Sequence, residues 1–333
     1  MAERTAARAV LLLTRRGDGE ATETAALLHR IGVPVHRIDA DGLAQVRAVR
    51  GPDGVLDLDG HRFTPTVTWL RHFSARAASP AGTPGGELVY RDAWTALARQ
   101  LAAASPAAIG ADDPGLLVQR DRARALGVRV PRALVTTDPA RAAELLPARR
   151  YVLKVLDRHY VEPEPGRLDW FLPRVLDRDR LGGPEATGLP HGTPVLLQEY
   201  VGHDAEYRVY CAGDEVHAFE VAKERPEDIW DRPDEVAVRR VRAPEAVVAA
   251  ARALAGEDGA GYGAYDFLWA GGEPVFLEMN AHGDWHWFER KAGTDAVTRA
   301  VVRTVRDLHR SAAGGARPEP VSLLAFLGAG RAG

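Results

Sequence analysis

Residues Tyr262–Glu289, YGAYDFLWAGGEPVFLEMNAHGDWHWFE, contain the pattern from which the rest of the chain can be interpreted. Ala264–Ala270 is apolar and aromatic, which is typical of a buried strand. Gly271-Gly272 is the signal for a two-residue hairpin turn, and Pro274–Met279 is the returning strand. This stretch therefore predicts a β-hairpin.

On the strands of this hairpin, Asp266, Glu278 and Asn280 carry carboxylate or amide oxygens. Glu278 and Asn280 are two residues apart and point to one face, and Asp266 can face them from the partner strand. Two carboxylates and an amide oxygen form a hard donor set that suits Mg²⁺. In the alternative, Asp266 caps a strand end and Glu278 is an exposed strand residue. Acidic residues between large apolar neighbours are unusual in a purely structural role, so we predict a magnesium site.

Composition sets the broad class of the protein. The chain has 333 residues, 46% of them hydrophobic, which is enough for two or three packed units. A net charge of −3 does not indicate a general nucleic-acid binder. The one cysteine, Cys211, excludes an intrachain disulfide, agrees with a cytoplasmic location, and is predicted to be a buried thiol. The apolar run at residues 7–14 is too short to span a bilayer, so we expect a first strand and no membrane partner.

The order of predicted elements indicates a small parallel sheet followed by mixed structure. The strand at Val10–Thr14, the helix at Glu20–Ile31 and the strand at Val33–Ile38 form a βαβ unit. No GxGxxG follows the first strand, so a dinucleotide fingerprint is absent. Residues 157–167 are predicted to be a loop, and the polar residues 224–235 are predicted to be mobile. Further strands are predicted at Val67–Phe73, Val128–Val135, Tyr151–Leu156, Val195–Val201, Tyr207–Cys211 and Glu215–Ala222, and further helices at Leu88–Ala103, Leu116–Leu126, Asp138–Leu146, Ala243–Ala255 and Thr294–Ser311.

Residues suited to holding a nucleotide triphosphate precede the hairpin in a fixed order. A lysine in mid-strand can reach phosphate oxygens, and the backbone at a strand end can bind an adenine edge. An acid on the next strand can accept bonds from ribose hydroxyls, and an arginine can bind phosphate with two nitrogen atoms. These residues are Lys154, the strand end Gln198-Glu199-Tyr200-Val201, Glu206 and Arg208. Basic runs such as residues 239–242 usually form a solvated face, but Arg240 or Arg242 could contact phosphate or an acidic group of the substrate.

This order of residues resembles the ATP-grasp superfamily from Leu116 to Arg310. The resemblance implies α/β and α+β structure: an ATP-grasp fold of two α+β lobes that close on ATP, preceded by a small parallel-sheet domain. It implies that Lys154 contacts adenine and phosphate, that Glu199 and Val201 hold adenine and Glu206 the ribose. Arg208 would stabilise the transferring phosphate. Asp266, Glu278 and Asn280 would bind Mg²⁺.

Two segments are similar to the ATP-grasp peptide maturases that make graspetides. FLEMNAHGDWHWFE, which begins at Phe276, is similar to their FLEvNPnGqWlWlE, and GVRVPRALVTTDP, which begins at Gly127, is similar to GLrvPrTLvTndP. The Trp285 and Trp287 pair is the more specific part, although both could be core residues. Residues 229–232 resemble the family's DWR segment with the order disturbed.

The sequence departs from the family pattern at three places. His282 and Asp284 follow the predicted metal ligands where the family has Asn and Gln. Leu116 stands where the family usually has a lysine, with Arg120 or Arg122 as candidate substitutes. The loop after Lys154 is not glycine-rich, so Arg158, His159 or the segment 223–235 would have to cover the phosphates. A zinc site of His282, Asp284 and His286 is a weaker alternative for this stretch.

We therefore expect an ATP-dependent ligase that turns a carboxylate into an acylphosphate and then an amide or ester, with ATP and Mg²⁺ as cofactors. The resemblance favours crosslinking of Asp or Glu side chains in a ribosomal precursor peptide, with residues 116–146 as a candidate leader-peptide groove and homo-oligomers as one option. Free amino acids or small acids as substrates, or a non-catalytic nucleotide-binding relative, stay open. The expected units are residues 1–110 (N-terminal domain), 111–195 (small lobe), 196–312 (large lobe with the magnesium site) and 313–333 (loose tail).

Overall fold

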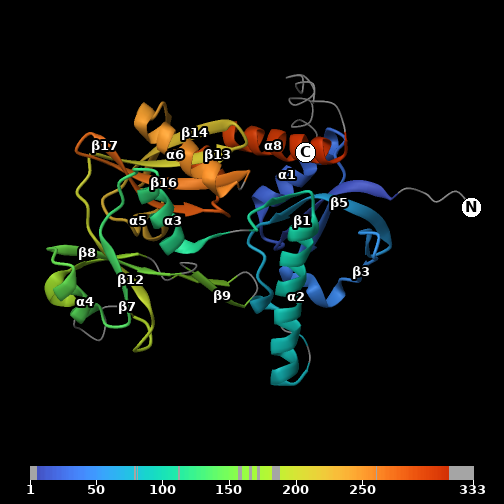
Figure 1. Cartoon of the computed structure of the whole chain (residues 1–333), viewed down its shortest axis with the longest axis horizontal. Helices are drawn as coiled ribbons and strands as arrows, with labels where there is room; N and C mark the ends of the chain where they lie inside the picture. The colour runs from blue at the N-terminus through green and yellow to red at the C-terminus, as the bar shows by residue number, and fades with distance from the viewer. Residues whose placement is uncertain are drawn as a thin grey trace, which may run out of the picture.

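The computed structural model describes residues 6–314, apart from residues 79, 81, 112, 157–159, 165–166, 171–172, 182–187 and 260. Its strands form three larger sheets and one two-stranded sheet. Figure 1 shows the first sheet at one end of the molecule and the other sheets at the opposite end, with helix α8 extending across their junction. The predicted tail, residues 313–333, lies almost wholly outside the described residues.

The first sheet has the predicted parallel core. Strands β2, β1, β5 and β6 are parallel, and β4 and β3 extend the sheet in antiparallel fashion. Helix α1 begins where the Asp18 carboxylate accepts a hydrogen bond from the Ala21 N–H at 2.9 Å. The short strand β6 was not predicted, because it lies in a segment rich in Pro and Gly. The elements are β1 (Ala7–Thr14), α1 (Gly19–Arg30), β2 (Val35–Asp39), η1 (Ala40–Gln45), β3 (Ala48–Arg50), β4 (Leu56–Leu58), β5 (His61–Leu70), η2 (Ala75–Ala77), α2 (Pro84–Ala104) and β6 (Ala107–Ile109).

The four-stranded sheet with the order β11-β8-β12-β7, called the small sheet below, is antiparallel throughout. Helix α4 packs against it and begins where the Asp138 carboxylate accepts a hydrogen bond from the Arg141 N–H at 3.1 Å. The prediction of a loop at residues 157–167 was wrong, since strands β9 and β10 pair there. Two prolines in this stretch made the sequence look like a loop and obscured the pattern of a strand. The elements are β7 (Ala133–Thr136), α4 (Pro139–Leu145), β8 (Arg150–Val155), β9 (Tyr160–Glu164), β10 (Arg167–Trp170), β11 (Arg174–Asp177), η3 (Arg178–Arg180) and β12 (Val195–Glu199).

The five-stranded sheet with the order β15-β14-β13-β16-β17, called the large sheet below, contains the predicted hairpin. Gly271 and Gly272 have φ angles of 65° and 82°, which a type I′ turn requires and glycine adopts without strain. Helix α3 packs against β17, and the polar segment 224–235, which is predicted to be mobile, contains the short helix α5. The elements are α3 (Gly115–Ala125), β13 (Ala205–Ala212), β14 (Glu215–Ala222), α5 (Asp228–Asp231), β15 (Ala237–Val241), α6 (Glu245–Asp258), β16 (Tyr262–Ala270), β17 (Glu273–Asn280), α7 (His286–Ala292) and α8 (Ala296–Ala312).

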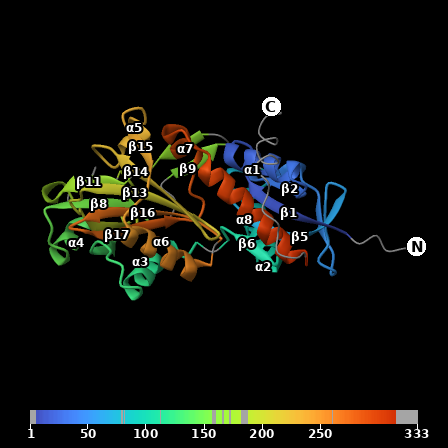
Figure 2. The same ribbon diagram turned by 90° about the horizontal axis from the view of Figure 1, so that it is seen from above.

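Helix α8 joins the first sheet to the large sheet through one hydrophobic core. Val297 and Val301 of α8 lie in the same buried cluster as Val10 of β1, Trp69 of β5 and Phe219 of β14. Figure 2, seen from above, shows α8 extending from the large sheet over the first one. The opposite face of the large sheet packs against α6. These contacts fix the position of the first sheet beside one end of the β16–β17 hairpin.

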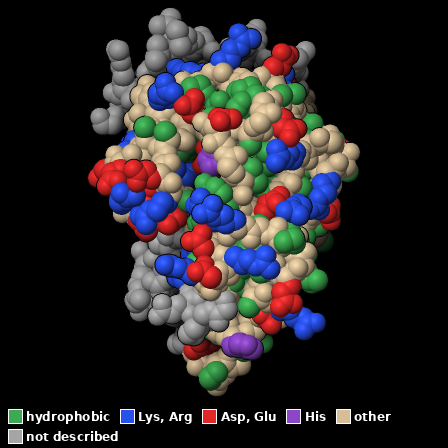
Figure 3. Space-filling model, turned by 90° about the vertical axis from the view of Figure 1, so that its left-hand side faces the viewer, with side chains coloured by type: hydrophobic (Ala, Val, Ile, Leu, Met, Phe, Trp, Pro, Cys, Tyr) green, Lys and Arg blue, Asp and Glu red, His purple; other side chains and the backbone are tan. Residues whose placement is uncertain are grey.

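The surface carries both signs of charge. On the face shown in Figure 3, the Lys and Arg side chains are interspersed with Asp and Glu side chains. This mixture agrees with the near-neutral composition and does not form the single-sign field of a general nucleic-acid binder. Among the helices that the structure describes, none is both long and apolar enough to cross a membrane.

Candidate active site

A row of charged residues crosses the large sheet at the predicted metal site. Asp266 and Glu278 are direct partners between β16 and β17, and Arg208 is the partner of Asp266 on β13. Because directly opposed residues share a face, these three side chains lie side by side on the face that also carries Tyr210. The hairpin therefore brings the predicted acids together as expected.

Asp266 is held by two neighbours. Its carboxylate accepts from Arg208 Nη1 at 2.7 and 3.0 Å and from Asn280 Nδ2 at 3.1 Å. Burial raises the pKa of Asp266, Arg208 counteracts this, and the charges of Glu278 and Glu206 raise it further. Burial would lower the pKa of Arg208, but the Asp266 charge raises it above its usual value. Burial and the neighbouring acids therefore disfavour the ionised form of Asp266, and the Arg208 guanidinium favours it.

Lys154 reaches this row from the small sheet. Its Nζ lies 2.6 Å from Oε2 of Glu278, and the two side chains are 6% and 14% exposed. The pair joins β8 of the small sheet to β17 of the large sheet, which are separate sheets. Lys154 thus lies beside the predicted metal ligands, a contact that the sequence did not predict, and its role toward adenine and phosphate stays a prediction.

Lys223 was not assigned a role from the sequence. It follows β14, donates to Glu206, and is 6% exposed. The sequence gives only a weak indication of a role for Lys223, because this residue begins the polar segment 223–235, which was expected only to cover phosphates. The chain has only three lysines, and two of them contact acids of this site. Composition was therefore a usable signal for Lys223.

The strand end predicted to bind adenine leaves the small sheet after Glu199. The Glu199 carboxylate accepts from Arg132 N and Nε at 2.8 Å each, and the Tyr200 N–H donates to the Arg150 carbonyl at 3.0 Å. Gln198 is buried, and the Val201 carbonyl lies 3.1 Å from Nδ1 of His203. The Glu199 side chain is therefore occupied by Arg132, so only backbone groups here would contact a base.

The donor set fits a hard cation. Asp266 and Glu278 supply carboxylates on one face, and Asn280 donates through Nδ2 to Asp266, which leaves its carbonyl oxygen for a metal. No group of three or more His, Cys, Asp or Glu side chains forms a metal site within the described residues. That finding does not test the predicted magnesium site, because this site consists of two carboxylates and one amide. The weaker zinc alternative gains no support, since His286 begins α7 whereas His282 precedes it.

Arg240 lies in the same cross-strand register as Arg208 and Asp266, with Phe219 of β14 between it and Arg208. It is exposed on edge strand β15, and its Nη2 lies 3.4 Å from Nδ1 of His217. Strands β14 and β13 separate β15 from β16, so the Arg240 backbone lies about 14 Å from that of Asp266, at about 4.8 Å for each strand step. The catalytic role of Arg240 stays a prediction.

No family model matches the sequence, and no curated protein matches it. Several solved structures do match. Macrocyclase MdnC bound with precursor peptide MdnA, from Microcystis aeruginosa MRC, has a TM-score of 0.71 at 16% identity and covers 88% of this chain and 98% of its own. A Chryseobacterium gregarium RiPP-associated ATP-grasp ligase, in complex with ADP and a leader and core peptide, has a TM-score of 0.69 at 17% identity and covers 95% and 100%. ATP-grasp ligase PsnB, complexed with a phosphomimetic minimal precursor, Mg and ADP, has a TM-score of 0.66 at 18% identity and covers 90% and 100%.

The chain has the ATP-grasp fold. The two α+β lobes expected from the sequence correspond to the small and large sheets, and the row of Lys154, Arg208 and Asp266 lies where these sheets meet. The domain boundaries proposed from the sequence stay predictions.

Arg120, one of the two arginines predicted to substitute for a lysine at Leu116, contacts the strand end that is predicted to bind adenine. Leu116 is buried on α3, one turn before Arg120. The Arg120 guanidinium donates to the Pro131 carbonyl and lies 3.4 Å from Oε1 of Gln198. Burial lowers the pKa of Arg120 to about 10, so it is still charged at neutral pH. Arg158 and His159, the other phosphate candidates, lie outside the described residues.

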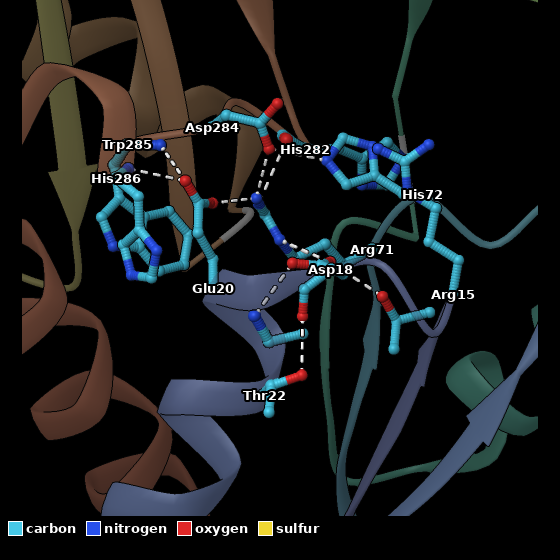
Figure 4. A network of polar contacts seen from close by, with 12 residues as sticks. Arg15, Asp18, Glu20, Thr22, Arg71, His72, His282, Asp284, Trp285 and His286 are labelled. Atoms are coloured by element: carbon cyan, nitrogen blue, oxygen red, sulfur yellow. Dashed lines mark hydrogen bonds and ion pairs between the residues drawn. The ribbon is translucent and has the colours of Figure 1, made fainter. Parts of the chain in front are cut away.

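The segment 281–286, which follows Asn280 in this ATP-grasp fold, is held by the first sheet. Figure 4 shows Arg71 between Asp18, Glu20 and Asp284. Arg71 is fully buried, its Nε lies 3.0 Å from Asp18 Oδ2 and its Nη2 lies 2.6 Å from Asp284 Oδ1, and it also pairs with Glu20. His72, with a φ of 52°, brings Nε2 to 2.9 Å from the same Asp284 oxygen. The sequence did not assign a role to Arg71 or His72.

The other carboxylate oxygen of Glu20 holds the start of α7. Glu20 Oε1 accepts from the N–H groups of Trp285 and His286 at 2.6 Å each. Burial raises the pKa of Glu20 to about 7 despite the charge of Arg71. In Asp284, whose side chain is largely exposed, loss of solvation opposes ionisation, but His72 and Arg71 together hold the pKa well below its usual range. Among the three carboxylates of this cluster, Glu20 is therefore the one whose pKa is raised.

The buried cluster touches the charged row through Gly283. A Cβ atom at Gly283 would lie 2.9 Å from Arg208 Nη2 and 2.4 Å from the Ala264 Cβ, so the backbone of Gly283 packs directly against Arg208. Tyr210 donates to the Asp284 carbonyl at 2.5 Å. Trp285 is fully buried and donates through Nε1 to Thr298 at 2.9 Å, which supports its structural reading as a core residue. Segment 281–285 thus connects the first sheet to Arg208.

Proposed function

We propose that the protein is an ATP-dependent ligase that activates a carboxylate as an acylphosphate and crosslinks acidic side chains of a precursor peptide. One observation carries this proposal: Lys154, Arg208, Asp266 and Glu278 form a continuous charged row where the small and large sheets meet. The fold similarity supports it, since MdnC and the Chryseobacterium ligase have a precursor, leader or core peptide in their complexes.

The residues of the row divide the work of phosphoryl transfer. Lys154 and Lys223 supply point charges for phosphate oxygens, and Arg208 supplies a planar fork whose orientation is fixed by Asp266. Asp266, Glu278 and the Asn280 amide would hold magnesium. When bound, magnesium would offset the negative charge of the phosphate groups.

The proposed reaction has two steps. A carboxylate oxygen of the substrate bonds to the γ-phosphorus of ATP, and the bond from that phosphorus to the bridging oxygen breaks and releases ADP. A hydroxyl or amine then attacks the acyl carbon, phosphate leaves with the electron pair, and the nucleophile releases its proton. Arg208, fixed between Asp266 and Gly283, is the residue placed to stabilise the transferring phosphate.

ATP binding tests the proposal directly. We expect wild type to bind ATP much more tightly with Mg²⁺ than without it in calorimetry, and Glu278→Gln to lose this dependence on Mg²⁺. Glu273→Gln is the matched control, because Glu273 lies on the same strand but pairs with exposed Arg129. If wild type binds ATP equally with and without Mg²⁺, or if both variants behave alike, the assignment of the site is wrong.

Mass spectrometry then tests the substrate. Synthetic peptides with Asp or Glu near Ser, Thr or Lys should lose one water for each ring formed, in a reaction that needs ATP and Mg²⁺. Phosphate release with free amino acids but not with peptides would instead support a ligase for small acids. ATP binding without turnover of any substrate would support the non-catalytic alternative. A cytoplasmic location and self-association belong to the same proposal and are read from fractionation and from gel filtration.

A further inference from the structure

Strand β17 lies at the edge of the large sheet, and residues from α3 and the segment after it bind its outer side. The predicted metal ligands Glu278 and Asn280 lie near the end of this strand. On the outer side, the Phe276 N–H donates to the carbonyl of Arg129 at 2.8 Å. Further along, Gln119 of α3 contacts Met279, the residue between the two predicted ligands. The end of β17 that carries these ligands is therefore supported from α3.

Gln119 binds the backbone of Met279 as a neighbouring strand would. Its Nε2 donates to the Met279 carbonyl at 2.9 Å, and its Oε1 accepts from the Met279 N–H at 2.8 Å. A carboxamide carries the donor and the acceptor of a peptide group, so one side chain replaces a strand partner that exchanges both bonds. Gln119 is 4% exposed, and the Asp113 carboxylate, 3.2 Å from Nε2, favours the orientation in which this nitrogen faces the carbonyl.

A β-bulge at Leu277 explains why the support is placed at Met279. Asp266 pairs with Glu278, but the next residue of β16, Phe267, pairs with Phe276, so Leu277 is an extra residue in β17. A bulge interrupts the ladder and shifts the alternation of the strand. The outward N–H group after Phe276 is therefore that of Met279, three residues on, and the Asp266–Glu278 pair lies directly beside an interrupted part of the sheet.

The two bonds from Gln119 hold the backbone on both sides of Met279. The Met279 N–H belongs to the peptide group that contains Cα of Glu278, and the Met279 carbonyl belongs to the peptide group that contains Cα of Asn280. Because each peptide group is planar, holding these two groups restricts the directions in which both side chains leave the strand. A binding site needs its groups held to within about 0.5 Å, which supporting hydrogen bonds of this kind provide.

We propose that Gln119 is a positioning residue for the magnesium ligands. It sets the directions of Glu278 and Asn280 through the Met279 backbone, and not through contact with metal or nucleotide. Loss of Gln119 therefore weakens the binding of ATP with Mg²⁺ and leaves the binding of ATP alone unchanged, since the strand end predicted to hold adenine belongs to the small sheet. This inference rests on the proposed function, because it takes Glu278 and Asn280 as metal ligands.

Calorimetric titration with ATP, with and without Mg²⁺, tests the inference. Gln119→Met has a side chain of similar volume that cannot form both bonds to Met279. In this variant the ratio of the two ATP affinities should fall about 10–100-fold, as is typical when a residue that supports a metal ligand is removed. The affinity for ATP without Mg²⁺ should stay that of wild type. Gln100→Met is the matched control, since Gln100 is exposed on α2, and it should change neither affinity.

Amide hydrogen exchange of the protein without nucleotide, followed by nuclear magnetic resonance, gives a second readout. In Gln119→Met the Met279 N–H should exchange faster than in wild type, because it loses its acceptor. The Phe276 N–H, whose acceptor is the Arg129 carbonyl, should keep its rate. Faster exchange at both positions would show a general loosening of β17 and would overturn the inference.

An unchanged affinity ratio in folded Gln119→Met, or an equal loss of ATP affinity with and without Mg²⁺, would also overturn it. If circular dichroism shows that Gln119→Met does not fold, Gln119→Glu at pH 8 takes its place. Its carboxylate keeps an acceptor for the Met279 N–H but has no donor for the Met279 carbonyl, so the ratio should still fall, and an unchanged ratio would count equally against the inference. Failure of the proposed function is separate, because it shows as wild type whose ATP affinity does not depend on Mg²⁺.

Discussion

Replacing Arg71 by methionine should destabilise the protein more than any surface ion-pair variant. The Arg71 side chain is fully buried, and its partners Asp18 and Glu20 are only 3% and 7% exposed. Methionine fills a similar volume but leaves both carboxylates without their cation. Breaking a buried pair by removing one partner costs about 3–5 kcal/mol, because an uncompensated charge stays buried. Asp284 is discounted here, since its side chain is 61% exposed and water can replace the contact.

The pH dependence of this cost follows from the carboxylates. In the Arg71→Met variant, Asp18 can lose its charge by binding a proton. From a pKa of 3.8, the free energy of protonation is at most about 6 kcal/mol at pH 8 and about 2 kcal/mol at pH 5. At pH 8 this route is therefore more costly than leaving the charge buried, and the full 3–5 kcal/mol is expected. At pH 5 the loss should fall to about 2 kcal/mol.

Urea unfolding at pH 8 and pH 5, followed by tryptophan fluorescence, measures both values. Trp285 is a suitable reporter because its ring lies 4.6 Å from the Arg71 guanidinium and is buried. Arg299→Met is the control, since Arg299 is 31% exposed and forms an i,i+4 pair with Asp295, so it should cost less than about 1 kcal/mol at either pH. A loss for Arg71→Met that matches the control, or that is equal at both pH values, would refute the charge-based reasoning.

Three further predictions concern the neighbourhood of this cluster. The folded protein raises the pKa of Glu20 from 4.5 to about 7, so between these pH values it binds more protons than the unfolded chain, and its stability should fall by up to about 3 kcal/mol as the pH rises. Glu20→Gln should flatten this pH dependence in thermal melts, and an unchanged dependence would exclude Glu20 as its source. Gly283→Ala should weaken Mg²⁺-dependent ATP binding about tenfold in calorimetry, because its Cβ would displace Arg208 at a cost of about 1–3 kcal/mol, and wild-type affinity would contradict the contact. Glu289→Ala should cost about 2 kcal/mol in urea unfolding, because the buried Glu289 carboxylate accepts from Val297 N at 2.6 Å and Thr298 Oγ1 at 2.6 Å; a loss below 0.5 kcal/mol would show that water replaces it.

Local pattern was sufficient for the hairpin and for the acids on it. The Gly271-Gly272 turn, the spacing of Glu278 and Asn280, and the apolar neighbours of Asp266 are all encoded within a short stretch. A two-residue turn sets the register of the strands next to it, and the period of two sets the face. The register shift between Asp266 and Phe267 was not visible in the sequence, but it leaves the Asp266–Glu278 pairing intact.

Contacts between distant segments could not be predicted. Lys154 and Glu278 are 124 residues apart, and Glu20 and Trp285 are 265 residues apart. Glu20 looked like an ordinary first-turn acid of a helix, which the macrodipole alone would explain. Only the packing of the first sheet against segment 281–286 reveals its second role.

The error at residues 157–167 has a physical origin. The sequence predicts a loop there, but strand pairing decides the structure of this stretch and is not a local property. The pairing of β9 with β10 stabilises a strand that contains a proline. The edge position of β15 exposes Arg240, whose catalytic role stays a prediction.

The shared core under α8 has a consequence for how this chain folds during synthesis. Val10, Val67 and Trp69 are among the first apolar residues to leave the ribosome, yet their cover includes Val297 and Val301 of the last described helix. The first sheet therefore presents an uncovered apolar face until nearly the whole chain has been translated. Such a face is a natural target for chaperones, and a nascent chain stalled before Ala296 should be prone to aggregation.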